Sequence, residues 1–299
     1  MNMKVDLCGV TLNNPVMTAS GTFGSGAEYA EFVDLNKLGA VVTKGVANVP
    51  WPGNPTPRVA EVYGGMLNAV GLQNPGIDLF VERDIPFLKQ FDTKIMVNVC
   101  GHSTEEYIEV VERLRDQPVD LLEINISCPK EGGIAFGQDP KAVEAITKEM
   151  KKHAAQPVIM KLSPNVTDIT EMARAAEAGG ADGLSLINTI TGMKIDINRQ
   201  KFVLANKTGG MSGPAIHPVA VRMVYQTAQA VRLPIVGMGG IMNAEDAIEM
   251  ILAGATAVSV GTANFTNPHV TEEIVAGIRD YMERYQVADI RDLVGAVHE

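Results

Sequence analysis

Cysteine is scarce in this chain, and its placement excludes the two structures that cysteines most often build. The 299 residues include three cysteines, Cys8, Cys100 and Cys128. Their number is odd, they lie far apart, and none belongs to a C-x-x-C pair, which argues against a disulfide framework and against a zinc site. Free cysteines are typical of a reducing compartment, so we expect a cytoplasmic protein.

Long apolar runs and basic clusters are also missing. The N-terminal MNMKVDLCGV has no apolar signal-peptide core, and no stretch approaches the roughly 18 apolar residues of a membrane helix. Asp and Glu number 35 against 25 Lys and Arg, which gives a formal net charge of −10. Such a surface repels a polyanion on average. We therefore expect neither a membrane span nor nucleic-acid binding.

One unit, repeated eight times, makes up most of the chain. Each time, a short apolar or β-branched run precedes a segment of helical periodicity. The eight runs occupy residues 14–20, 40–45, 94–101, 121–128, 157–163, 183–189, 234–240 and 257–263. Asp168 and Asn243 stand where N-caps are expected, and Gly179 and Gly254 stand where helices should end. Eight βα units without a linker predict a single α/β domain, a (β/α)8 TIM barrel, over residues 1–299.

Three segments fall outside this repeat. Residues 3–12 alternate around a Cys-Gly pair, which predicts an N-terminal β-hairpin over the bottom of the barrel. The stretches 46–75 and 190–216 are too long for simple turns, and long loops at the catalytic face of a barrel usually cover a substrate. We therefore expect both loops to lie over the C-terminal face.

Polar residues gather at the C-terminal ends of the predicted strands, where barrels place their active sites. Singly, an asparagine there is most often a turn residue and a lysine is usually solvated. Together, they would be costly to bury without a polar ligand, so the sequence predicts a ligand site. The strand-end residues are Ser20, Lys44, Asn98, Asn125, Cys128, Lys161, Ser163, Asn188, Thr189, Gly239, Gly240, Gly261 and Thr262.

The last two strand ends are glycine turns, GMGGI at 237–241 and VGTANF at 260–265. Either could be a tight turn and nothing more. Barrels commonly bind phosphate in these two loops, however, because glycine lets backbone N–H groups approach an anion. GTFGSGAEY at 21–29 has the spacing G-x-x-G-x-G and no Rossmann context, so we reject it as a dinucleotide fingerprint.

Cys128 differs from the other cysteines in its position. It ends a predicted strand at the lip of the pocket and precedes Pro129, whereas Cys8 and Cys100 suit ordinary buried sites. Even the small thiolate fraction of an ordinary cysteine at pH 7 can act as a base or nucleophile. Cys128 is therefore the candidate catalytic residue. His102 and His217 could approach it only through the fold.

Several of these segments together resemble the class 1 dihydroorotate dehydrogenases, and the resemblance covers the whole chain. It rests on NPVMTASGTFGSG, TKG, NAVGLQNPG, NISCP, KLSPN, INT, GGMSGPAIHP and GMGGI. It implies a barrel that binds one FMN per chain and oxidises (S)-dihydroorotate to orotate in de novo pyrimidine (UMP) biosynthesis. Cys128 would remove the C5 proton while hydride passes from C6 to the flavin. Membrane-linked relatives carry an N-terminal extension and a serine base, so Cys128 favours class 1.

The resemblance also assigns further residues to the site. Their types suit the roles, since a cation such as Lys161 can lie where charge accumulates on flavin reduction, and asparagine offers donors and acceptors to a pyrimidine. No metal is implied. The substrate contacts would be Lys44, Asn68, Ala69, Val70, Gly71, Leu72, Asn125, Asn188 and Thr189. The flavin contacts would be Ser20, Lys44, Gly45, Asn98, Asn125, Lys161, Ile187, Gly213, Gly239, Gly240, Gly261 and Thr262.

Within class 1, GTFGSG, GLQNPG and SGPAIHP resemble the NAD-linked class 1B subset. Catalytic chains of that subset form a homodimer core, which binds an electron-transfer subunit carrying FAD and a [2Fe-2S] cluster to give a heterotetramer. This chain has no dinucleotide fingerprint and no four-cysteine motif, so electrons would reach NAD only through that partner. The chain departs from the family at CPKEGG, where Lys130 replaces the usual asparagine and the stretch before the glycines is shorter.

Other interpretations remain open at this point. A fumarate-linked class 1A enzyme would share the fold. A Schiff-base aldolase barrel would use Lys161 or Lys44 as nucleophile and leave the Cys128 segment unexplained. A phosphosugar isomerase-like barrel would also use the glycine turns, but it would want an acidic pair at the strand ends. A non-catalytic flavin-binding protein would have no need of Cys128.

Overall fold

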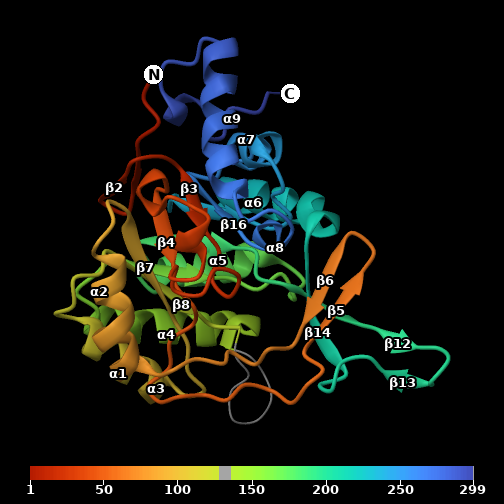
Figure 1. The fold of residues 1–299 in the computed structure, drawn as a ribbon. Helices are drawn as coiled ribbons and strands as arrows, with labels where there is room; N and C mark the ends of the chain where they lie inside the picture. Colours follow the sequence, from red (N-terminus) through yellow and green to blue (C-terminus); the bar gives the residue numbers. More distant parts are fainter. Residues whose placement is uncertain (128–135, 299) are drawn as a thin grey trace.

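The predicted barrel is present. The computed structural model describes residues 1–127 and 136–298. Eight parallel strands close a barrel in the order β10, β15, β16, β3, β4, β7, β8, β9. Figure 1 labels β3, β4, β7, β8 and β16 among them. Each strand lies within one of the eight predicted runs. They are β3 (Val16–Thr18), β4 (Ala40–Val42), β7 (Lys94–Val99), β8 (Leu121–Asn125), β9 (Val158–Lys161), β10 (Gly183–Leu186), β15 (Ile235–Met238) and β16 (Ala257–Val260).

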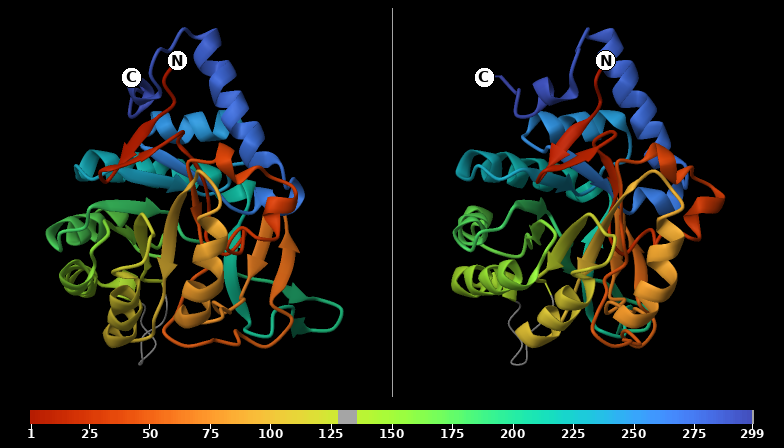
Figure 2. Two further views of the ribbon diagram at one scale, coloured as in Figure 1. Left: turned by 60° about the vertical axis from the view of Figure 1, so that its left-hand side comes forward. Right: turned by 90° about the vertical axis from the view of Figure 1, so that its left-hand side faces the viewer.

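Helices connect successive strands and lie around the outside of the barrel (Figure 2). The longer ones are α3 (Thr104–Leu114), α4 (Pro140–His153), α5 (Ile169–Ala178), α6 (His217–Ala230), α7 (Ala244–Leu252) and α9 (Val270–Arg284). Short helical segments are α1 (Ile77–Leu79), the π-helical η3 (Phe80–Asp84), α2 (Ile85–Leu88), α8 (Ala263–Thr266) and the 3-10 helices η4 (Phe136–Gln138), η5 (Pro214–Ile216) and η6 (Ile290–Leu293).

The helix boundaries follow the capping signals of the sequence. The side chain of Asn243 accepts a hydrogen bond from the backbone N–H of Asp246, and that of Asp168 accepts one from Thr170. Each cap satisfies an N–H group that has no partner within its helix. At the other end, Ala253 is the C-cap of α7, and Gly254 follows it with φ of 126°, a conformation that glycine adopts without strain. The predicted caps are confirmed.

The segment after β3 is an exception to the predicted alternation. It contains two short 3-10 helices, η1 (Tyr29–Glu31) and η2 (Leu35–Lys37), where an α-helix was expected. Gly21, Gly24 and Gly26 precede them with φ values of 86°, 57° and 93°. Three left-handed residues within six positions interrupt a right-handed helix, so this connection runs as irregular chain.

The N-terminal hairpin closes the bottom of the barrel, as predicted. Strands β1 (Val5–Leu7) and β2 (Val10–Leu12) pair across Cys8 and Gly9, which have φ of 57° and 84°. Positive φ at both central residues is the requirement of a type I′ turn. Burial and the nearby Asp182 raise the pKa of the Cys8 thiol to about 12, which disfavours its thiolate at neutral pH.

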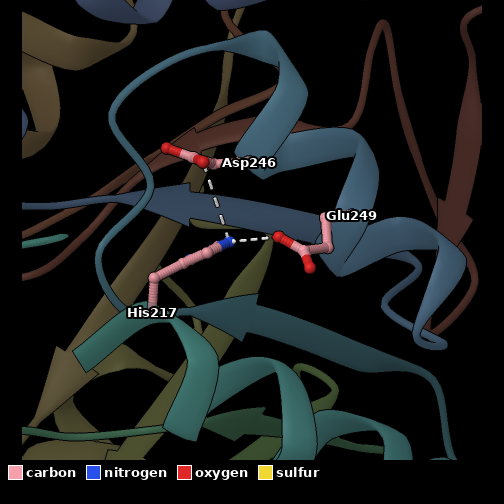
Figure 3. Close-up of side chains that lie close together, drawn as sticks. All are labelled: His217, Asp246 and Glu249. Carbon is pink, nitrogen blue, oxygen red and sulfur yellow. Dashed lines mark hydrogen bonds and ion pairs between the residues drawn. The ribbon is translucent and has the colours of Figure 1, made fainter. Parts of the chain in front are cut away.

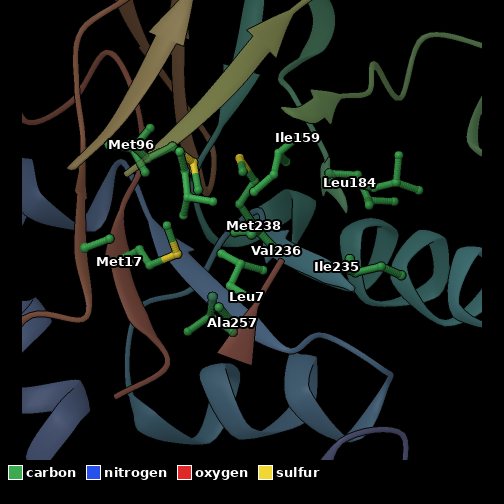
Figure 4. Packing of buried hydrophobic residues seen from close by; sticks show 14 of the residues in the cluster. Leu7, Met17, Met96, Ile159, Leu184, Ile235, Val236, Met238 and Ala257 are labelled. Carbon is green, nitrogen blue, oxygen red and sulfur yellow. The ribbon is translucent and has the colours of Figure 1, made fainter. Parts of the chain in front are cut away.

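Leu7 is the residue that the hairpin inserts into the core. It is fully buried and belongs to the same packed cluster as Met17, Val236 and Ala257 from three barrel strands (Figure 4). The adjacent turn touches the start of β10, since a Cβ added to Gly183 would lie 2.7 Å from the Cys8 sulfur. The lower half of the barrel is therefore a packed apolar core with the hairpin as its floor.

The two long loops meet over the opposite face and pair with each other. Strands β5 (Val59–Val62) and β6 (Gly65–Asn68) come from the first loop, and β11 (Ile190–Met193) and β14 (Thr208–Ser212) come from the second. They form one antiparallel sheet in the order β11, β14, β6, β5. A further hairpin, β12 (Ile195–Asp196) and β13 (Lys201–Phe202), projects away from the barrel (Figure 1).

Within residues 1–127 and 136–298, the structure contains no helix with both the length and the apolar character needed to cross a bilayer.

We predict that Leu7→Ala destabilises the protein by about 2–5 kcal/mol, because it removes a fully buried side chain from the barrel floor and leaves a cavity. Urea unfolding followed by circular dichroism measures the change. Leu79→Ala is the matched control, since Leu79 is 39% exposed and its truncation should have a much smaller effect. Equal losses in the two variants would show that the hairpin does not support the core.

Candidate functional site

A cavity of about 560 Å³ opens at the C-terminal ends of the barrel strands. All the predicted substrate and flavin contacts line it except Asn98, which lies fully buried beneath it. Cys128 falls outside the described residues. The structure therefore brings the predicted residues together around one space, whereas their individual roles remain predictions.

One wall of the cavity carries a connected set of side-chain amides. The Nδ2 group of Asn188 donates to the Ser127 hydroxyl at 2.9 Å and to the Asn125 Oδ1 at 3.3 Å. The Oδ1 atom of Asn188 accepts from the backbone N–H of Thr189 at 2.8 Å. The Tyr107 hydroxyl donates to the backbone carbonyl of Asn125. These bonds fix which amide groups face the cavity, so the wall can present oriented donors and acceptors to a planar polar ligand.

Ser127 and Tyr107 were not singled out in the sequence. Ser127 lines the cavity and directly precedes Cys128 in the chain. Tyr107 is fully buried on α3, and only the fold shows that its hydroxyl reaches Asn125. Ser163, a predicted strand-end residue, does not line the cavity; its hydroxyl accepts from the backbone N–H of Asn165.

Two lysines from different strand ends line the cavity. Lys44 follows β4, and its burial is the main cause that lowers its pKa below the ordinary 10.5; Cys100 acts in the opposite direction, and Arg58 adds to the lowering. Lys161 ends β9, is 4% exposed, and donates from Nζ to the Ser20 hydroxyl at 3.0 Å. Both side chains can supply positive charge where water has little access.

A carboxylate that the sequence analysis missed lies below Lys161. Glu123 is in the middle of β8, is fully buried, and has its Oε2 atom 3.6 Å from the Lys161 Nζ. The same oxygen accepts from the Asn98 amide at 2.6 Å. Its signal in the sequence is an acidic residue inside the apolar run LLEIN, a position that seldom holds an unpaired charge.

Glycines with left-handed φ values line the far side of the cavity. Gly213, Gly239 and Gly240 have φ of 111°, 132° and 69°. A Cβ on Gly240 would lie 2.7 Å from the Gly213 carbonyl oxygen, and one on Gly239 would lie 2.6 Å from the Ala220 Cβ. Nearby, the Thr262 hydroxyl donates to the Ser212 hydroxyl at 2.7 Å. The turns bring the backbone close to the cavity, as an anion-binding loop requires.

His217 supports these turns from behind, away from the cavity. Its Nδ1 atom donates to the Gly239 carbonyl oxygen at 2.8 Å. Its Nε2 atom lies 3.1 Å from a Glu249 oxygen and 3.9 Å from an Asp246 oxygen, so the ring points between two carboxylates of α7 (Figure 3). His217 does not line the cavity, whereas His102 does. The histidine therefore ties α6 and α7 to the glycine turn.

An aromatic pair stands at the mouth of the cavity. The Trp51 and His102 rings stack with their centroids 4.1 Å apart and their planes 16° apart, and both residues line the cavity. Trp51 is held by paired backbone hydrogen bonds with Asn74. Trp51 was not predicted, because nothing local in the sequence brings the first long loop against the segment after β7.

We predict that Gly240→Ala weakens binding of a phosphate-bearing ligand, measured as FMN affinity by equilibrium dialysis. The left-handed φ and the close Gly213 carbonyl impose strain of about 1–3 kcal/mol, which the turn relieves by shifting out of its binding geometry. Each 1.4 kcal/mol needed to restore that geometry in the complex raises the dissociation constant about tenfold. Gly180→Ala is the control: its φ is also left-handed, at 88°, but a Cβ there would meet only the Lys151 Cγ atom, at 3.9 Å. Unchanged FMN affinity in Gly240→Ala would rule out the turn as a phosphate site.

Comparisons with known proteins give a full-length match. A family model described as dihydroorotate dehydrogenase matches residues 2–282. The chain is 71% identical to the catalytic subunit of dihydroorotate dehydrogenase B (NAD(+)) of Lachnoclostridium phytofermentans, over 99% of this chain and 100% of the relative. It is 64% identical to the protein of the same name from Alkaliphilus metalliredigens, over 99% of each chain, and 54% identical to that of Geotalea uraniireducens, over 99% of this chain and 98% of the relative. The chain therefore belongs to the dihydroorotate dehydrogenase family.

Proposed function

We propose that this protein oxidises (S)-dihydroorotate to orotate in pyrimidine biosynthesis. The electrons removed from dihydroorotate would pass through FMN and a partner subunit to NAD. The observation that carries the proposal is the convergence of Lys44, Asn125, Lys161 and Asn188 on one cavity of a chain that matches the family over nearly its whole length. A barrel that oxidises a substrate with a flavin needs a substrate pocket, a flavin pocket and a base close together.

The substrate would bind at the amide wall. Its ring offers amide N–H and C=O groups, which match the donors and acceptors that Asn125 and Asn188 hold in fixed orientations. Its carboxylate would be neutralised by Lys44. The segment from Asn68 to Leu72, on and after β6, lines the same cavity and would cover the substrate. Covering loops exclude water and strengthen each of these polar contacts.

FMN fits the remaining part of the cavity. Its phosphate would bind at Gly213, Gly239, Gly240 and Gly261, where side-chain-free backbone borders the cavity. The Ser259 hydroxyl lines the cavity and has no hydrogen-bond partner among the described residues, which leaves it available to the ligand. The isoalloxazine ring would contact Lys161 and Ile187. When bound, FMN supplies the acceptor for the hydride from C6 of dihydroorotate.

The chain itself supplies the proton chemistry. We propose that the Cys128 thiolate removes the C5 proton, so that loss of this proton and of the C6 hydride leaves the C5–C6 double bond of orotate. Cys128 lies outside the described residues, and the proposal rests on its place directly after Ser127, which lines the cavity. Lys161 would hold positive charge beside the flavin edge that becomes electron-rich on reduction.

Transfer of electrons from FMN to NAD would require other subunits. The relatives named above are catalytic subunits, and we propose a homodimer core joined by an electron-transfer subunit with FAD and a [2Fe-2S] cluster into a heterotetramer. The projecting hairpin supports a protein partner, because Ile195 and Ile197 on it are 53% and 82% exposed and Phe202 is 46% exposed. Exposed apolar side chains on one projection are typical of an interface. We further propose a cytoplasmic location and a single domain over residues 1–299.

We predict that the chain reconstituted with FMN loses its visible flavin absorption when dihydroorotate is added without oxygen. Cys128→Ala should retain FMN but reduce it at least about 100-fold more slowly, because general base catalysis contributes roughly 10²–10⁴-fold. Cys128→Ser, the conservative control, should keep partial activity that rises with pH, since a hydroxyl is a weaker base. Full activity in Cys128→Ala would exclude this residue as the base.

We predict that orotate binding weakens as pH rises through the lowered pKa of Lys44, at a pH below the 10.5 of an ordinary lysine. The protonated form binds the carboxylate, so affinity is present below this pKa and is lost above it. Orotate titrations followed by the flavin spectrum would measure the effect in the Cys128→Ala background, where the Cys128 thiol cannot contribute. Lys44→Arg should hold its affinity over the same range, because arginine stays charged. The same pH dependence in Lys44→Arg would contradict the assignment.

A further inference from the structure

Glu123 is a buried carboxylate that the proposed chemistry does not use. It lies at the third position of β8, is fully buried, and does not line the cavity. Its neighbours on the strand, Leu122 and Ile124, are apolar and also fully buried. A charge in such a place destabilises the fold unless its surroundings compensate it, so a well-packed apolar residue would stabilise the fold more.

Three polar groups surround this carboxylate. Oε1 accepts from the Ser185 hydroxyl of β10 at 2.7 Å, and Oε2 accepts from the Asn98 amide of β7 at 2.6 Å. The Lys161 ammonium of β9 lies 3.6 Å from Oε2. Each of these groups is a hydrogen-bond donor, an arrangement that stabilises a negative charge. The four residues form a polar layer on the adjacent strands β7, β8, β9 and β10, and Lys161 connects this layer to the cavity that it lines.

Glu123 thereby fixes two residues that are predicted to touch the flavin. Lys161 is held from below by Glu123 and from the cavity side by the Ser20 hydroxyl at 3.0 Å. The Asn98 amide nitrogen donates to Glu123, so the Asn98 Oδ1 atom faces away from the carboxylate. This buried oxygen has no hydrogen-bond partner among the described residues. It lies 3.1 Å from the position of a Cβ on Gly45, which lines the cavity.

We propose that Glu123 is a positioning residue for Lys161 and that its negative charge lowers the reduction potential of the bound flavin. The inference rests on the proposed FMN site. A free lysine cation beside the flavin would favour the electron-rich reduced form strongly, which would hinder transfer of electrons onward to NAD. Glu123 compensates part of that charge from below while keeping the ammonium in place, so the flavin holds its electrons less tightly.

The test is the midpoint potential of FMN bound to Glu123→Gln, measured by equilibration with reference dyes in the absence of dihydroorotate. Glutamine keeps the shape and can bond Ser185 and Asn98, but it removes the charge. We expect the affinity for reduced over oxidised FMN to rise at least tenfold, which is an upward shift of about 30 mV for a two-electron couple. Glu123→Asp, which keeps the charge but retracts it from Lys161, should shift the potential upward by less.

Two control variants separate the charge from the packing. Ser185→Ala removes a hydrogen bond to the same carboxylate and leaves its charge, and Glu283→Gln removes an exposed charge on α9. Both should leave the potential near that of the wild type. A potential in Glu123→Gln that is unchanged, lowered, or matched by either control would overturn the inference. If Glu123→Gln fails to fold, the Glu123→Asp variant takes its place. A midpoint potential of that variant at or below the wild-type value would overturn the inference.

The outcomes also distinguish this inference from the proposed function. A wild-type chain that binds FMN but is not reduced by dihydroorotate would refute the proposed reaction, while the dye measurement would still decide the role of Glu123. A wild-type chain that binds no FMN would overturn both.

Discussion

Each barrel strand is hydrogen-bonded to a neighbour on both sides, so none of the eight has a free edge. This closure fixes the register of every strand against the next and brings all eight C-terminal ends to one mouth. Lys161 and Ser20 are 141 positions apart in the chain, yet their side chains share a hydrogen bond. Closure therefore places the residues at the strand ends around one cavity.

The barrel interior divides into two halves with different physical roles. The lower half is apolar, and Leu7, Met17 and Met96 fill it without polar atoms that need partners. The upper half holds Glu123, whose buried carboxylate is compensated by the Asn98 amide and the Lys161 ammonium. The lower half can therefore stabilise the fold while the upper half presents polar groups at the cavity, a separation that is general in barrels of this kind.

The covering sheet depends on contacts that no local pattern determines. Strand β6 of the first long loop pairs with β14 of the second, and each contributes residues to the cavity. Close approach here requires residues without side chains: a Cβ on Gly209 would lie 2.8 Å from the Asn68 carbonyl oxygen. The same two loops carry Trp51 and Gly213, so the mouth of the cavity and its glycine-lined side are built together.

Short-range patterns along the chain were enough to predict the strands, the helix starts and most of the strand-end residues. Alternation of apolar runs with helical periodicity located all eight strands, Asn243 and Asp168 marked helix starts, and the strand ends supplied most of the cavity lining. The missing α-helix after β3, the buried Glu123 and the support of the glycine turn by His217 emerged only in three dimensions. Glu123 and Ser185 are 62 positions apart, and His217 and Glu249 are 32 apart. Contacts across such separations depend on how the closed barrel and its helices pack, and periodicity along the chain carries no information about them.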